Sequence, residues 1–185
     1  MPDTSIDSIL NNMRKLLLIL LLCSKMSYAQ FIKADLVASG LTCSMCNLAT
    51  QKQLQTLNFV DSIVPDLETN TFYIYFNQQH EIDFGLIKKK VEDAGFFVAA
   101  LTVLYKQSSA YRYNNSILFL ENSVLFIDKY EENKAQQVFK FIDEGFLTAK
   151  EFKKFRKQKQ ELLLLSDAIA LEIGTNKKIY YVVGQ

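Results

Sequence analysis

The sequence predicts an α+β protein in two parts. Between residues 31 and 104, segments that alternate like strands and segments with helical spacing of apolar residues follow one another in the order β-α-β-β-α-β. After residue 105 the pattern changes to short strand-like segments with a single helix. The composition suits a globular fold, because 49% of the 185 residues are hydrophobic and 22% are charged.

The first part contains four strand-like segments. They lie at residues 31–38, 59–64, 71–76 and 96–104. The third is the clearest, because Thr71-Phe72-Tyr73-Ile74-Tyr75-Phe76 is rich in β-branched and aromatic residues. A polar turn at residues 66–70 separates it from the second.

Two helices complete the first part. Residues 45–57 contain neither Gly nor Pro, and Leu54 and Leu57 fall on one face. Asp83 is placed to cap the second helix, which Gly95 ends. The apolar stripe of this helix is Phe84, Ile87, Val91 and Ala94. This order of elements is that of the split βαβ or ferredoxin-like fold.

The second part is expected to be mostly β. Candidate strands lie at residues 117–120, 124–127, 137–142, 162–165, 168–173 and 179–183. Thr148-Ala149-Lys150-Glu151 forms a capping box that opens one helix, with Phe152 and Phe155 on its buried face. Short strands with one helix are typical of a small barrel or curved sheet, similar to an OB-fold. Because polar residues cluster near 105–115, we expect domains at 30–104 and 105–185.

The N-terminus resembles an export signal. Met13-Arg14-Lys15 is basic, residues 16–23 are apolar, and Ser27-Tyr28-Ala29 carries small residues where a signal peptidase cleaves. A helix of eight residues is about 12 Å long, whereas a membrane span must cross about 30 Å. We therefore expect a signal peptide at residues 1–29, in which 1–12 are an upstream extension. The cleaved protein would be periplasmic or secreted, with no stable membrane insertion.

Residues 30–185 contain two cysteines, Cys43 and Cys46. Both fall at the expected start of the first helix, where free N–H groups and partial positive charge stabilise thiolate over thiol. A closed zinc site needs four ligands, but the same region offers only one histidine, His80. Two thiolates alone suit a soft cation such as Cu(I). A disulfide in an oxidising compartment and a thiol–disulfide couple are alternatives.

Two motifs resemble a known family. Gly40-Leu41-Thr42-Cys43-Ser44-Met45-Cys46 is similar to the G-M-T-C-x-x-C metal loop of heavy-metal-associated domains. These domains occur in copper chaperones, copper-transporting ATPases and the periplasmic mercury-binding protein. Glu92-Asp93-Ala94-Gly95-Phe96 is similar to the family's E-x-A-G-F/Y segment. The resemblance implies that Cys43 and Cys46 are metal ligands and that Phe96 shields the loop.

The chain departs from the family pattern at three positions. Leu41 replaces the usual Met, an exchange that conserves volume. Asn47 and Thr50 stand where apolar residues are common, which predicts weaker packing of the first helix or a polar face for a partner. The two-part arrangement also resembles secreted heavy-metal-associated proteins of Bacteroidetes-type bacteria.

These observations predict an exported metal-binding protein rather than an enzyme. It would carry or sequester Cu(I) and pass it to a metal-exporting ATPase or another carrier protein; Hg(II), Ag(I) and Cd(II) fit the same thiolate pair. The net charge of +1 argues against nucleic-acid binding, and the cations of residues 150–159 are interpreted as a solvated helix face. The alternatives are a metal-free interaction module that functions through residues 105–185, and a thiol–disulfide oxidoreductase.

Overall fold

The computed structural model describes residues 13–14, 31–106, 112–113, 117–120, 122–131, 134–160, 164, 168, 171 and 177–185. Apart from residues 13 and 14, the expected signal peptide lies outside the described residues. No helix in the described part of the chain is both long enough and apolar enough to span a membrane.

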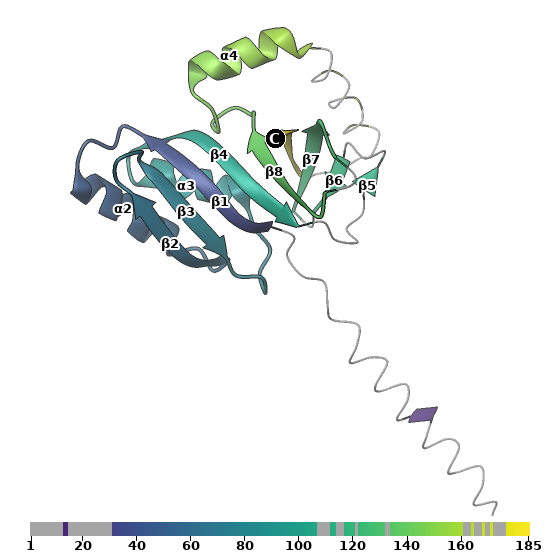
Figure 1. Cartoon of the computed structure of the whole chain (residues 1–185), viewed down its shortest axis with the longest axis horizontal. Helices are drawn as coiled ribbons and strands as arrows, with labels where there is room; N and C mark the ends of the chain where they lie inside the picture. The colour runs from purple at the N-terminus through teal and green to yellow at the C-terminus, as the bar shows by residue number, and fades with distance from the viewer. Residues whose placement is uncertain are drawn as a thin grey trace, which may run out of the picture.

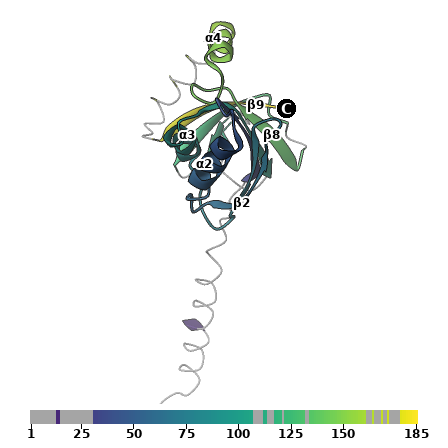
Figure 2. The same ribbon diagram turned by 90° about the vertical axis from the view of Figure 1, so that its left-hand side faces the viewer.

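The first part has the predicted order of elements (Figure 1). They are β1 (Phe31–Ser39), α2 (Ser44–Leu54), β2 (Val60–Asp66), β3 (Thr71–Phe76), α3 (Phe84–Asp93) and β4 (Phe97–Lys106). The strands pair antiparallel in the order β2-β3-β1-β4. Both helices lie on the same side of this sheet (Figure 2). The ferredoxin-like prediction is therefore confirmed.

Helix α3 forms for the reasons that its sequence indicates. The Asp83 carboxylate accepts hydrogen bonds from the N–H groups of Gly85 at 2.8 Å and Leu86 at 3.2 Å, which caps the helix. Phe84, Ile87 and Val91 are fully buried. The chain leaves the helix at Gly95, whose φ of 88° favours glycine.

Within its described residues, the second part is mostly β, as predicted, and contains the predicted helix α4. Its elements are β5 (Arg112–Tyr113), β6 (Ile117–Phe119), β7 (Ser123–Asp128), β8 (Gln136–Phe141), α4 (Ala149–Gln158) and β9 (Lys178–Gly184). These strands do not form an OB-like barrel of their own. They extend the first sheet to nine strands, in the order β2-β3-β1-β4-β8-β9-β7-β6-β5. The OB-like expectation is therefore wrong.

The junction between the two parts is the antiparallel pairing of β4 with β8. Thr102 pairs with Lys140, and Lys106 pairs with Gln136. Without β8, β4 would be an edge strand with a row of unpaired N–H and C=O groups, and β8 pairs with the part of this row at residues 102–106. The domain boundary near residues 105–115 stays a prediction, although the sheet runs across it.

Aromatic packing also crosses from one part to the other. The ring of Phe84 lies 4.7 Å from that of Phe141 and 6.0 Å from that of Tyr180. Tyr105, at the end of β4, lies 5.4 Å from both Phe31 and Phe139. These residues belong to one buried cluster, so the two parts share a hydrophobic core.

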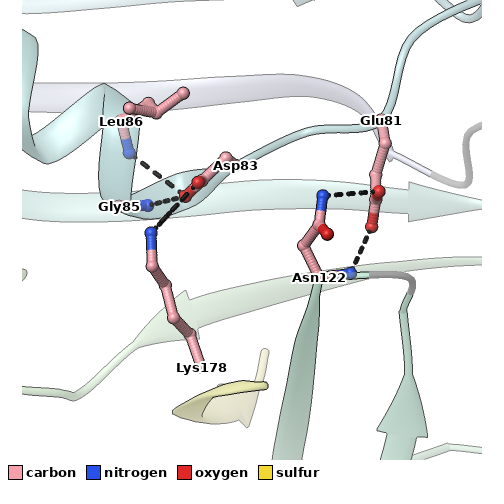
Figure 3. Close-up of polar contacts among 6 residues, drawn as sticks. All are labelled: Glu81, Asp83, Gly85, Leu86, Asn122 and Lys178. Atoms are coloured by element: carbon pink, nitrogen blue, oxygen red, sulfur yellow. Dashed lines mark hydrogen bonds and ion pairs between the residues drawn. The ribbon is translucent and has the colours of Figure 1, made fainter. Parts of the chain in front are cut away.

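Two polar contacts fasten the segment before α3 to the second part (Figure 3). The Glu81 carboxylate accepts hydrogen bonds from the backbone N–H of Asn122 at 2.7 Å and from its side-chain amide at 2.8 Å. The Lys178 ammonium lies 3.0 Å from the Asp83 carboxylate. Asp83 therefore caps α3 and also binds the start of β9.

Helix α4 begins at the predicted capping box. Glu151 N–H donates to Thr148 Oγ1 at 3.3 Å, and Thr148 N–H donates back to the Glu151 carboxylate at 3.3 Å. Phe152 and Phe155 are only half-buried, against a second apolar cluster on the face of the second part's strands opposite the main core. The face of α4 that was expected to be buried is therefore only partly buried.

The strands expected at 162–165 and 168–173 are wrong at the residues that the structure describes. Leu164, Ala168 and Leu171 are helical, and the remaining positions of both ranges lie outside the described residues.

Candidate metal centre

The two cysteines occupy the N-terminus of α2. Cys43 is the N-cap residue, and its carbonyl accepts hydrogen bonds from the N–H groups of Cys46 at 3.0 Å and Asn47 at 3.2 Å. The N–H of Cys46 also points to Cys43 Sγ at 3.2 Å. Cys43 is exposed and Cys46 is half-buried, with Cα atoms 5.2 Å apart. A sulfur that accepts an amide N–H at a helix N-terminus is stabilised as a thiolate.

The two sulfurs are joined in a disulfide in this structure. The oxidised pair has no thiolate to offer a metal, so reduction by two electrons must precede binding. This structure therefore describes the oxidised pair of the disulfide alternative. The assignment of Cys43 and Cys46 as metal ligands stays a prediction.

The apolar side chains of Leu41 and Phe96 pack against the loop that carries the cysteines. Leu41 is 7% exposed and belongs to the main core cluster, so leucine fills the place of the family's methionine. Gly40 has a φ of 89°, which favours glycine, and a Cβ at this residue would lie 3.5 Å from the Phe96 ring. Phe96 thus packs beside the loop, as the resemblance implies.

Asn47 and Thr50 are buried beneath the cysteines, with 5% and 0% exposure. Of the two alternatives for these residues, the polar face for a partner is therefore wrong, and the prediction of weaker packing stays untested. The Asn47 amide donates to the Cys43 carbonyl at 3.4 Å, and the Thr50 hydroxyl donates to the Cys46 carbonyl at 3.1 Å. Each cysteine carbonyl is thus held by a polar side chain four residues later in the helix.

Asn47 extends this support to the turn between β2 and β3. Its amide also lies 3.4 Å from Asn70 Oδ1, while its own Oδ1 is buried and has no hydrogen-bond partner among the described residues. A buried unsatisfied oxygen costs about 1–3 kcal/mol, so this position is not optimised for stability. Asn47 lies four residues after Cys43, and Thr50 lies four residues after Cys46. This spacing is the signal that sequence reasoning missed.

Other candidate ligands are not brought to the loop. His80 is exposed in the turn that follows β3, whereas the loop follows β1, and the antiparallel pairing of these strands places the two at opposite ends. Met45 is 68% exposed at the variable position of the motif. Within the described ranges, no cluster of three or more His, Cys, Asp or Glu residues could hold a metal ion.

Comparison with known proteins points to the same segment. Residues 36–97 match the family profile of the heavy-metal-associated domain, and this match includes both cysteines. A 60-residue segment is 35% identical to a probable copper-exporting P-type ATPase of Archaeoglobus fulgidus. It covers 32% of this chain but spans only 7% of the ATPase.

Solved structures give partial matches as well. The yeast copper transporter domain Ccc2a, studied in apo and Cu(I)-loaded states, is 31% identical over 35% of this chain and 88% of its own, with a TM-score of 0.32. The CopZ metallochaperone is 22% identical over 36% of this chain and 98% of its own, with a TM-score of 0.34. The predicted resemblance to heavy-metal-associated domains is confirmed by the profile match for residues 36–97.

Proposed function

We propose that this protein binds Cu(I) through the reduced thiolates of Cys43 and Cys46 and carries or sequesters it outside the cytoplasm. The observation that carries the proposal is the cysteine pair at the N-terminus of α2, inside a segment that matches the heavy-metal-associated profile. Two thiolates suit Cu(I) because it is soft and tolerates two ligands. The pair would leave a net negative charge, which the partial positive charge of the helix N-terminus offsets.

The exposure of Cys43 supports a role in metal transfer. An incoming thiolate from a partner can approach a two-coordinate ion without first displacing a ligand. The metal would then pass from one thiolate pair to the other by exchange of Cu–S bonds, with no net redox change. The partner would be a metal-exporting ATPase or another carrier, and Hg(II), Ag(I) and Cd(II) would compete for the same sulfurs.

A competition titration tests metal binding. The reduced protein should take one equivalent of Cu(I) from a strong chromogenic chelator, and the Cys43→Ser/Cys46→Ser variant should take none. Met45→Leu and His80→Gln are matched controls, since each removes a nearby or alternative ligand and should leave the affinity unchanged. A double-serine variant that retains copper as well as the parent would refute the proposed site.

The oxidised pair supports a second candidate, a metal-free interaction module that functions through residues 105–185. Export and redox state can be measured together. Mass spectrometry of protein from the periplasm, alkylated before and after reduction, reports the cleavage site, the thiol state and the bound metal. Cleavage after Ala29 with alkylatable thiols favours the carrier, whereas a disulfide and no metal favour the interaction module.

A further inference from the structure

A cavity of about 540 Å³ lies beside α4, apart from the cysteine loop. Its wall includes Phe152, Lys153, Arg156 and Lys157 of α4, together with Tyr181 of β9 and Asp143 after β8. Helix α4 and the cysteine-bearing helix α2 are far apart in both views (Figures 1 and 2). The volume falls within the range of small-molecule sites, roughly 300–1,000 Å³.

The rim of the cavity is cationic. Lys153, Arg156 and Lys157 are exposed, and none of them makes an ion pair with another described residue. By contrast, Lys159 at the end of the same helix lies 2.9 Å from the Asp128 carboxylate. The three cations line the cavity with one carboxylate, that of Asp143, so the rim carries excess positive charge at neutral pH. Such a rim attracts an anionic group.

The inner wall of the cavity is aromatic and fixed by packing. Tyr181 is 8% exposed, and its ring stacks on that of Phe126 with centroids 5.9 Å apart. Phe152 packs against the same second apolar cluster. Aromatic walls held in place by a core present a preformed apolar surface to a ligand.

We propose that this cavity binds a small organic anion. Its acidic group would be held by Lys153, Arg156 and Lys157, and its apolar or aromatic body would pack against Phe152 and Tyr181. The ligand class follows from the combination of a cationic rim and an aromatic wall. The proposal is independent of metal binding, since no residue of the cavity belongs to the cysteine loop.

A dye titration of the full chain tests the proposal, with 8-anilinonaphthalene-1-sulfonate as the probe. The parent should bind one equivalent saturably, and dissolved dodecanoate should displace it. Lys153→Gln/Arg156→Gln should weaken binding about tenfold or more, because it removes two of the three cations that would hold the acidic group. The matched control is Lys150→Gln/Lys154→Gln, which removes the same charge from the same helix outside the cavity.

The controls separate a site from general attraction to a basic helix. The control pair should change the affinity by less than about twofold, and N-phenyl-1-naphthylamine, which lacks the sulfonate, should bind much more weakly than the sulfonated dye. Circular dichroism and thermal unfolding check that each variant is folded. Equal losses in the two pairs, equal binding of both dyes, or binding only to anionic phosphatidylglycerol vesicles would overturn the proposal.

Discussion

Replacement of Phe84 by alanine tests whether the two parts of the chain fold as one unit. Phe84 is 0% exposed and begins α3, in the first part. Its ring lies 5.2 Å from that of Phe31 in the first part, but 4.7 Å from Phe141 and 6.0 Å from Tyr180 in the second. The substitution therefore opens a cavity that borders both parts.

The expected cost follows from this burial. Removal of a buried phenylalanine side chain lowers the free energy of unfolding by about 3–5 kcal/mol. For a domain of this size, 1 kcal/mol corresponds to roughly 2–4 °C in Tm, so the variant should melt roughly 10 °C lower. Leu86→Ala, on the same helix with 39% of its surface exposed, is the matched control and should cost less than about 1 kcal/mol.

Differential scanning calorimetry is the direct assay. A shared core predicts one transition for the parent and one for Phe84→Ala, shifted as a whole. Two transitions of which only one moves would show that the parts unfold independently, and the reasoning from the continuous sheet would fail. A shift no larger than that of Leu86→Ala would show that the ring is not packed as described.

Three further predictions concern the interface, the loop and pH. Gly85→Ala would place a Cβ 3.0 Å from the Tyr180 hydroxyl, so it should lower the free energy of unfolding in urea by about 1 kcal/mol despite the better helix propensity of alanine. Thr50→Val removes the hydrogen bond to the Cys46 carbonyl but keeps the side-chain shape. It should weaken Cu(I) binding about tenfold with little loss of stability, whereas Thr50→Ser should bind like the parent. Burial raises the pKa of Asp143 to about 6, so the folded state disfavours its charge and loses stability as pH rises from about 4 through 6. Asp143→Asn should therefore be more stable than the parent at pH 7.5, by about 1–2 kcal/mol after allowance for partial solvent exposure, and equally stable at pH 4; a constant difference in Tm across this range would contradict the assignment.

The elements of the first part could be predicted because local signals and tertiary packing agree there. Asp83 caps α3, three apolar residues of the predicted stripe are fully buried, and β3 has the predicted bounds of residues 71–76. The cysteine loop was found in the same way, because its spacing places both sulfurs at a helix N-terminus whatever surrounds it. Local sequence was sufficient for these features.

The features that were missed depend on distant partners. Pairing of β4 with β8 joins strands separated by the residues between Lys106 and Gln136, and no local pattern encodes such a register. Asn47 and Thr50 were expected to weaken the packing of the first helix or to form a polar face for a partner, yet both are buried and each finds a hydrogen-bond acceptor in the turn before it. Leu164 and Leu171 lie in a short apolar run that is compatible with a strand or a helix. Over so short a stretch, the periodicity of apolar residues does not distinguish the two.

X-ray absorption at the copper K-edge, recorded on the reduced protein loaded with one equivalent of Cu(I), tests the central claim most directly. Two thiolates from Cys43 and Cys46 predict a first shell of two sulfur atoms and no nitrogen or oxygen. A shell that includes a histidine nitrogen or a third sulfur from Met45, or a reduced protein that takes up no copper, would contradict it.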